Sequence, residues 1–238
     1  MIADHLKNLT CRIKNACERA ERDVAEVTLV AVAKGQPASK IWEAVQTGVR
    51  QIGENYAQEM LSHAGAIHEW PLYPIEWHFI GHLQRNKVKP ILEKVALIHS
   101  VDSLPLAEEI NRRATALGKI QPILLELNLG GEGSKTGLAP TKLESVVREL
   151  VSMSALWCKG LMTVPPEQPT PEAVRPFFRQ LREIRDAIND KKMYKSPLTE
   201  LSMGMTRDFE VAIEEGATIV RIGTGIFGAR GKNDGEKS

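Results

Sequence analysis

The 238-residue sequence predicts an α/β fold in which eight parallel strands alternate with helices and close into a single-domain (β/α)8, or TIM, barrel. Short β-branched runs alternate with longer amphipathic stretches along the chain, which is the pattern of βαβ units. Runs such as LVAVA and PILLELNL are apolar throughout, as in strands covered on both faces. An open doubly wound sheet is the alternative, but eight strands and a length near about 250 residues favour the barrel.

The chain is predicted to begin with a helix, because Ile2, Leu6, Leu9, Ile13 and Cys17 recur at helical spacing. The strands that follow are predicted from short runs rich in β-branched residues. They are Val27–Lys34, Gln51–Gly53, Trp77–Gly81, Ala96–Val101, Ile123–Leu129, Lys159–Val164, Leu198–Met203 and Thr218–Gly223.

The segments between the strands are predicted to be helices, because apolar residues recur in them every three to four positions. They are Ala38–Thr47, Tyr56–Ala66, Lys87–Lys94, Leu104–Leu117, Pro140–Ser152, Pro171–Asn189 and Asp208–Glu215. Strand and helix alternation resumes after the proline-rich stretch 164–171, which is therefore predicted to be a loop within the domain. We expect one barrel domain over residues 1–230, followed by a disordered tail at 231–238 (GKNDGEKS).

Composition and charge exclude several classes of protein. Lys and Arg number 31 against 30 Asp and Glu, so the net charge of +1 argues against nucleic-acid binding. No apolar run reaches about 18 residues, so no membrane contact is expected. The three cysteines form no CxxC pair and the N-terminus is too charged for a signal peptide, which favours a cytoplasmic protein. No heptad pattern indicates an obligate dimer, so a monomer is expected.

In a TIM barrel the functional residues lie at the C-terminal ends of the strands, and Lys34 ends the first one. Alternation places Lys34 on the same face as Val30 and Val32, so its ammonium is expected above an apolar layer at the barrel mouth. An amine in that position can form a Schiff base. The alternative is a lysine that extends from the strand end into solvent.

Two glycine-containing segments are candidates for binding a phosphate. Ser202–Thr206 (SMGMT) follows the seventh strand and Gly223–Gly225 (GTG) follows the eighth, and loops after these two strands often bind phosphate in this fold. Backbone N–H groups and the hydroxyls of Ser202, Thr206 and Thr224 would be the donors. The alternative is that the glycines serve only as turn residues.

Other motifs are less informative. In 130–136 (GGEGSKT), Ser134 stands where a P-loop needs glycine, so that motif is rejected. Lys135 is left as a second candidate amine near the mouth, and the favoured alternative is a solvated loop lysine. His78 and His82 lack a third ligand at metal spacing. His78 is expected to pack in the core and His82 to reach the mouth.

Taken in order, these residues resemble the pyridoxal-phosphate homeostasis protein family, also called the alanine racemase N-terminal-domain-like family. The matching pieces are Leu29–Pro37, Gln51–Gln58, Trp77–Val88, His99–Ser103, Asn128, Ser134–Gly137, Gly160–Thr163, Leu201–Asp208 and Arg221–Gly228. The residues beside the lysine depart from the family pattern, with Ala33 where serine is frequent and Gly35 where threonine is usual. The resemblance extends from about the first strand to Gly228.

The resemblance implies a fold-type III barrel that carries pyridoxal 5′-phosphate (PLP) as an aldimine on a lysine, here Lys34. It implies that Asn55 lies beside the cofactor ring and that Arg221 faces the pyridine nitrogen. The phosphate-binding residues implied are Ser202, Met203, Gly204, Met205, Thr206, Gly223 and Thr224. We add His82 as a further cofactor-binding residue, and we expect no metal site.

The function that the resemblance implies is a largely non-catalytic carrier that buffers PLP, with PLP-dependent apoenzymes as recipients. The alternative is a fold-type III enzyme such as an amino-acid racemase, and weak racemase-type side activity remains open. Racemases that resemble this barrel have a further C-terminal β-domain, and the ten residues that follow Gly228 here are too few for one, so we expect the carrier. A phosphate-sugar binder on the same barrel would leave Lys34 unexplained.

Overall fold

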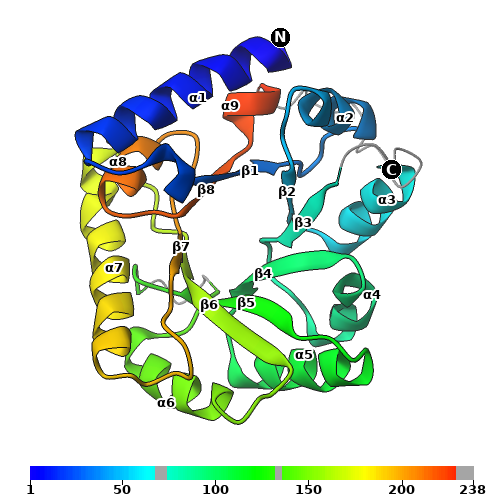
Figure 1. Cartoon of the computed structure of the whole chain (residues 1–238), viewed down its shortest axis with the longest axis vertical. Coiled ribbons are helices and arrows are strands. Elements are labelled where there is room, and N and C mark those ends of the chain that lie inside the picture. Colours follow the sequence, from blue (N-terminus) through cyan, green and yellow to red (C-terminus); the bar gives the residue numbers. More distant parts are fainter. Residues whose placement is uncertain (68–73, 132–135, 229–238) are drawn as a thin grey trace, which may run out of the picture.

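Eight parallel strands form a closed barrel in the computed structural model, which describes residues 1–67, 74–131 and 136–228 (Figure 1). The strands are β1 (Thr28–Val32), β2 (Gln51–Glu54), β3 (Glu76–Phe79), β4 (Val95–Val101), β5 (Gln121–Leu127), β6 (Leu156–Thr163), β7 (Glu200–Ser202) and β8 (Ile219–Ile222). Strand β1 pairs with both β2 and β8, which closes the sheet. The predicted (β/α)8 fold is therefore confirmed.

Helices surround the barrel, and α1 packs across α8 and α9 (Figure 1). They are α1 (Ile2–Arg19), α2 (Ala38–Gln46), α3 (Ala57–Ile67), α4 (Val88–Leu92), α5 (Leu104–Ala116), α6 (Pro140–Leu150), α7 (Arg175–Asp190), α8 (Phe209–Glu214) and α9 (Thr224–Phe227). Short 3-10 helices precede β1, α4 and α7, at Val24–Glu26, Arg85–Lys87 and Glu172–Val174. No helix within the described ranges is long and apolar enough to cross a membrane.

The sequence prediction missed α9, because it treated the residues after the eighth strand as a glycine loop. The Gly223 carbonyl accepts from the amides of Ile226 and Phe227, and these bonds wind the segment into a short helix. The proline-rich stretch 164–171 is a loop, as predicted. The predicted tail at 231–238 and the candidate amine of Lys135 lie outside the described residues.

Two apolar layers stabilise the barrel. The larger one lies between the strands and the helices, whereas a separate cluster fills the barrel lumen. The lumen cluster consists of Val30, Leu97, Leu124, Met162 and Ile219. Two residues further along their strands, His99 follows Leu97 and Arg221 follows Ile219 on the same face. The lumen thus changes from apolar to polar towards the C-terminal ends of the strands.

The connection after β3 passes very close to the end of β2. A Cβ atom on Gly81 would lie 2.2 Å from the Asn55 carbonyl oxygen, a distance that no side chain tolerates. Glycine at position 81 therefore allows the backbone carrying His82 to lie directly beside the backbone carrying Asn55.

We expect Gly81→Ala to lower the free energy of unfolding by about 1–3 kcal/mol, because one of the two backbones must shift. Gly65→Ala in α3 is the matched control, since a Cβ there meets nothing within 4 Å. Alanine at that helical position should raise stability by up to about 1 kcal/mol. Denaturant unfolding measures both, and equal midpoints for the two variants would contradict the close contact.

Candidate functional site

Lys34 lies in the turn that follows β1 rather than in the strand, which ends two residues earlier than predicted. Its side chain is partly buried, and Nζ lies 5.0 Å from the centroid of the Tyr56 ring. This is the geometry of a cation–π contact. No ion pair in the described part of the chain involves Lys34, so its amine faces an aromatic ring rather than a carboxylate.

Helix α3 holds this turn in place. Glu59 Oε2 accepts from the Gly35 amide at 3.0 Å, and Gly35 adopts a left-handed φ of +66°. On the same helix, His63 Nδ1 lies 2.7 Å from Oε1 of Glu54, at the end of β2. Burial raises the pKa of Glu54, and the hydrogen bond to Glu54 raises the pKa of His63. The ends of β1 and β2 are thus joined through one helix.

The sequence analysis did not identify Glu54, Glu59 or His63 as supports of the lysine turn. Glu54 carried a signal, because it directly precedes Asn55 at a predicted strand end and the structure buries it fully. A buried carboxylate needs a hydrogen-bonding partner, here the imidazole of His63. Nothing in the local sequence pattern shows that α3 supplies that partner.

The loops after β7 and β8 meet through their hydroxyl groups. Thr224 Oγ1 donates to Thr206 Oγ1 at 3.1 Å, and the Gly225 amide donates to the same oxygen at 3.2 Å. A Cβ on Gly225 would lie 3.2 Å from Thr206 Cγ2, so glycine permits this approach. Thr224 is exposed and Thr206 partly buried, so the cluster is accessible at the mouth. Thr206 Oγ1 accepts both of these bonds and keeps its own proton, so the cluster presents a hydroxyl donor at the mouth.

Gly204 shapes the first of these loops, because it adopts a left-handed φ of +91° and packs against α8. The Met205 amide then donates to Asp208 Oδ1 at 2.6 Å. Burial raises the pKa of Asp208. Met205 is exposed, whereas Met203 is fully buried beneath the loop. The predicted loop residues therefore divide into an accessible group and a buried one.

Gly223 connects this cluster to the lysine turn. A Cβ on Gly223 would lie 3.5 Å from the backbone oxygen of Val32, the last residue of β1. The Gly223 backbone therefore lies beside the strand end from which the Lys34 turn departs.

Ser202 differs from the other predicted phosphate donors, because its side chain points into the barrel lumen. It is fully buried, and its Oγ accepts from Nη1 of Arg221 at 2.6 Å. Among the predicted hydroxyl donors, Thr206 and Thr224 lie together at the mouth, and Ser202 supports Arg221 below them.

Arg221 lies in the lumen with 4% of its surface exposed. Its Nη2 donates to the Thr163 carbonyl at 2.9 Å, so two hydrogen bonds fix the plane of the guanidinium. Burial lowers the pKa of Arg221 to about 10, so the group stays charged at neutral pH. The side chain is thus a rigid, buried cation that only donates hydrogen bonds.

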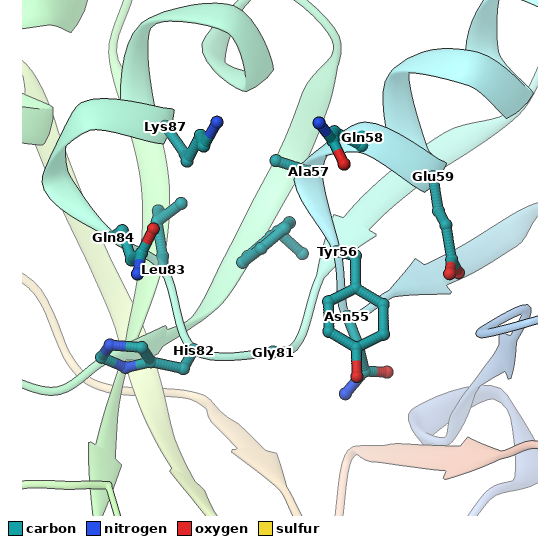
Figure 2. A pocket seen from close by; sticks show the side chains of 11 residues that line it. Asn55, Tyr56, Ala57, Gln58, Glu59, Gly81, His82, Leu83, Gln84 and Lys87 are labelled. Atoms are coloured by element: carbon teal, nitrogen blue, oxygen red, sulfur yellow. The ribbon is translucent and has the colours of Figure 1, made fainter. Parts of the chain in front are cut away.

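A cavity of about 760 Å³ lies at the rim beside the ends of β2 and β3 (Figure 2). It is lined by Asn55, Tyr56, Ala57, Gln58, Glu59, Phe79, Gly81, His82, Leu83, Gln84 and Lys87. Asn55 and Tyr56 approach from one side and His82 from the other, with His82 Nδ1 3.1 Å from Asp102 Oδ2. Tyr56 also contacts Lys34, so its ring joins the cavity to the lysine.

Metal binding has no support in the described residues, where no three His, Cys, Asp or Glu side chains gather in a suitable group. His78 takes part in a buried hydrogen-bonded pair, with Nδ1 2.8 Å from His99 Nε2. His82 lies apart from this pair, bound to Asp102.

Comparison with known proteins adds to this geometry. The family described as alanine racemase, N-terminal domain, matches residues 5–231. A pyridoxal phosphate homeostasis protein of Aquifex aeolicus (strain VF5) is 46% identical over 227 residues, which cover 95% of this chain and 97% of the relative. The protein of that name from Escherichia coli (strain K12) is 38% identical over 229 residues, or 96% and 97% of the two chains.

Two solved structures are also similar to this chain. The structure of PipY from Synechococcus elongatus PCC7942 with PLP bound has a TM-score of 0.83 and 34% identity, and the match covers 96% of this chain and 100% of that one. An alanine racemase of Clostridium difficile 630 shares the fold, with a TM-score of 0.69 and 16% identity over 97% of this chain and 58% of that one. Full-length similarity to the named relatives, on a barrel with an amine and a cluster of hydroxyl groups at its mouth, shows that this chain belongs to the pyridoxal phosphate homeostasis protein family.

Proposed function

We propose that this protein binds PLP at the barrel mouth and carries or buffers it within the cell. The observation that carries the proposal is Lys34, an amine at the mouth that contacts an aromatic ring and forms no ion pair with any described residue. The lysine is partly exposed at the mouth, so an aldehyde can reach its amine, and a lysine amine is the group that forms a Schiff base. The names of the relatives and the PLP-bound PipY structure support this choice of ligand.

The residues present fit the chemical groups of PLP. Its phosphate matches the cluster of Thr206, Thr224 and the Gly225 amide, and its aldehyde matches the amine of Lys34. Its ring nitrogen is a hydrogen-bond acceptor, and Arg221 is a buried residue with donors only. Asn55 is the residue we assign to the ring edge. When bound, PLP supplies an aldehyde that forms a covalent bond to Nζ with loss of water.

We further propose that the protein is a carrier and not an enzyme. A guanidinium donates to the ring nitrogen and gives it no proton, so the ring stays neutral and withdraws electrons less strongly than a pyridinium. Arg221 would therefore restrain carbanion chemistry on a bound amino acid. Transfer of PLP to apoenzymes, a monomeric state and a cytoplasmic location are part of this proposal and rest on the sequence.

Lys34→Ala should abolish covalent attachment of PLP, because it removes the amine that reacts with the aldehyde. We would load the protein with PLP, reduce it with borohydride, digest it and locate the modified peptide by mass spectrometry. The wild-type protein and a Lys40→Ala control, altered at an exposed lysine in α2, should carry the label on Lys34. A full cofactor load on reduced Lys34→Ala would disprove the assignment.

Thr224→Val should weaken PLP binding about tenfold to a hundredfold, because a hydrogen bond to a charged group contributes roughly 1.5–3 kcal/mol. Pyridoxal, which lacks the phosphate, should lose much less affinity. Thr115→Val, at an exposed position on α5, is the control. Equilibrium dialysis with both ligands measures the effect, and an equal loss for the two would place the phosphate elsewhere.

The alternative function is amino-acid racemisation, which the fold shared with alanine racemase brings into consideration. We expect the PLP-loaded protein to racemise common amino acids far below the ordinary enzymatic range of about 1–10³ per second. Chiral chromatography of each amino acid after long incubation tests this expectation. Turnover within that range for any one amino acid would show that the protein is an enzyme rather than a carrier.

A further inference from the structure

A chain of hydrogen-bonded side chains crosses the barrel lumen beneath the mouth. It begins at Arg221 on β8, whose Nη1 donates to Ser202 Oγ on β7 at 2.6 Å. The same oxygen lies 2.8 Å from His99 Nδ1 on β4, and His99 Nε2 lies 2.8 Å from His78 Nδ1 on β3. All four residues are buried, with exposed fractions of 0–4%. The chain therefore links four strands within the buried part of the lumen.

The guanidinium gives this chain a direction. Arginine only donates, so Ser202 Oγ accepts from Arg221 and keeps one proton to donate. The acceptor within reach of that proton is His99 Nδ1, which leaves the His99 proton on Nε2. The Nε2–H group then donates to His78 Nδ1, and His78 carries its own proton on Nε2. Each link thus has one donor and one acceptor, and the terminal His78 Nε2 is not among the buried side-chain atoms of the described residues that lack a partner.

The opposite direction leaves a group unsatisfied. If His99 donated through Nδ1, Ser202 Oγ would accept from both neighbours, and its own proton would need another acceptor. Within the described residues, Arg221 and His99 are the hydrogen-bonding partners of this hydroxyl. Leaving this buried donor without a partner carries a desolvation cost, and that cost selects the first direction.

The charged groups around the chain agree with two neutral imidazoles. Burial lowers the pKa of His78 to about 4, and the positive charge of Lys159 adds to the effect. Burial also lowers the pKa of His99, and both His78 and Arg221 oppose a further positive charge there. Glu126 and Asp208 are the acidic groups that act on Arg221 itself. At neutral pH Arg221 is thus the one cation within the four-residue chain.

We propose that His99 is a positioning residue for Arg221: by accepting the Ser202 proton, it keeps the Ser202 oxygen turned to accept from the guanidinium. The inference rests on the proposed function, in which Arg221 faces the ring nitrogen of PLP. Without an acceptor at position 99, the Ser202 hydroxyl is free to rotate. In some of its orientations the hydroxyl proton points at the Arg221 guanidinium and repels it. The guanidinium would then lose its fixed plane, although its Nη2 still donates to the Thr163 carbonyl.

Nuclear magnetic resonance of the ¹⁵N-labelled full chain tests the direction without any cofactor. Imidazole ¹⁵N–¹H correlations distinguish the two tautomers, and we expect His99 and His78 both protonated on Nε2 and neutral at pH 7. A proton on His99 Nδ1, or a charged His99, overturns the proposal. The same spectra measure hydrogen exchange at the Arg221 guanidinium, which we expect to be slow in the wild-type protein.

Variants of His99 test the positioning role. His99→Leu removes the acceptor, whereas His99→Asn retains one, with Oδ1 replacing Nδ1. Ser100→Ala is the control, because Ser100 is buried on the same strand and its hydroxyl has no partner among the described residues. We expect guanidinium exchange to be faster in His99→Leu, and close to that of the wild-type protein in His99→Asn and Ser100→Ala.

The same variants are then loaded with PLP. In His99→Leu, we expect PLP affinity to fall about fivefold to tenfold, as for the loss of one hydrogen bond. The pH dependence of the visible absorption should also shift, which a purely structural change would not cause. Identical exchange, affinity and pH profile in His99→Leu and Ser100→Ala overturn the proposal. If His99→Leu does not fold, the wild-type tautomers and the exchange rate in His99→Asn decide it.

Failure of the proposed function would look different. If the wild-type protein binds no PLP, the carrier function is wrong, while the tautomers and the guanidinium exchange still show whether His99 positions Arg221.

Discussion

The parallel pairing of β1 with β8 closes the barrel, and the arrangement of the mouth depends on that closure. It brings the first and last strands of the sequence together, with the Gly223 backbone beside Val32. The turn that carries Lys34 and the loop that carries Thr224 therefore leave neighbouring strands, although 190 positions separate these two residues in the chain. An open sheet with the same elements would place the amine and the hydroxyl cluster at opposite edges.

Closure also creates the lumen, and a buried guanidinium there must be solvated by the protein itself. Ser202 and the Thr163 carbonyl supply that solvation from two other strands. Because the supporting groups come from β6 and β7, the position of Arg221 depends on strand register around this part of the barrel. Fold and site are therefore coupled, since a slip of one residue in β7 would turn the Ser202 side chain out of the lumen.

The sequence predicted the eight strands, the surrounding helices and the strand ends that carry the site, because these follow from periodicity and strand order. It did not predict that Ser202 turns inward, since the side-chain direction depends on where the short strand β7 ends. The pairing of His99 with Ser202 joins residues 103 positions apart, and it was also beyond local patterns. Likewise, the support of the lysine turn by Glu59 and His63 depends on how α3 packs.

The contact between Lys34 and Tyr56 has a consequence for how the amine becomes reactive. A ring attracts a cation through its quadrupole, and this attraction requires the positive charge. Once Nζ gives up its proton, the ring no longer holds it by that force, and the flexible four-carbon stem is free to swing. The Tyr56 ring therefore restrains Lys34 only while the amine carries a proton. An amine ready to attack an aldehyde is no longer held by the ring.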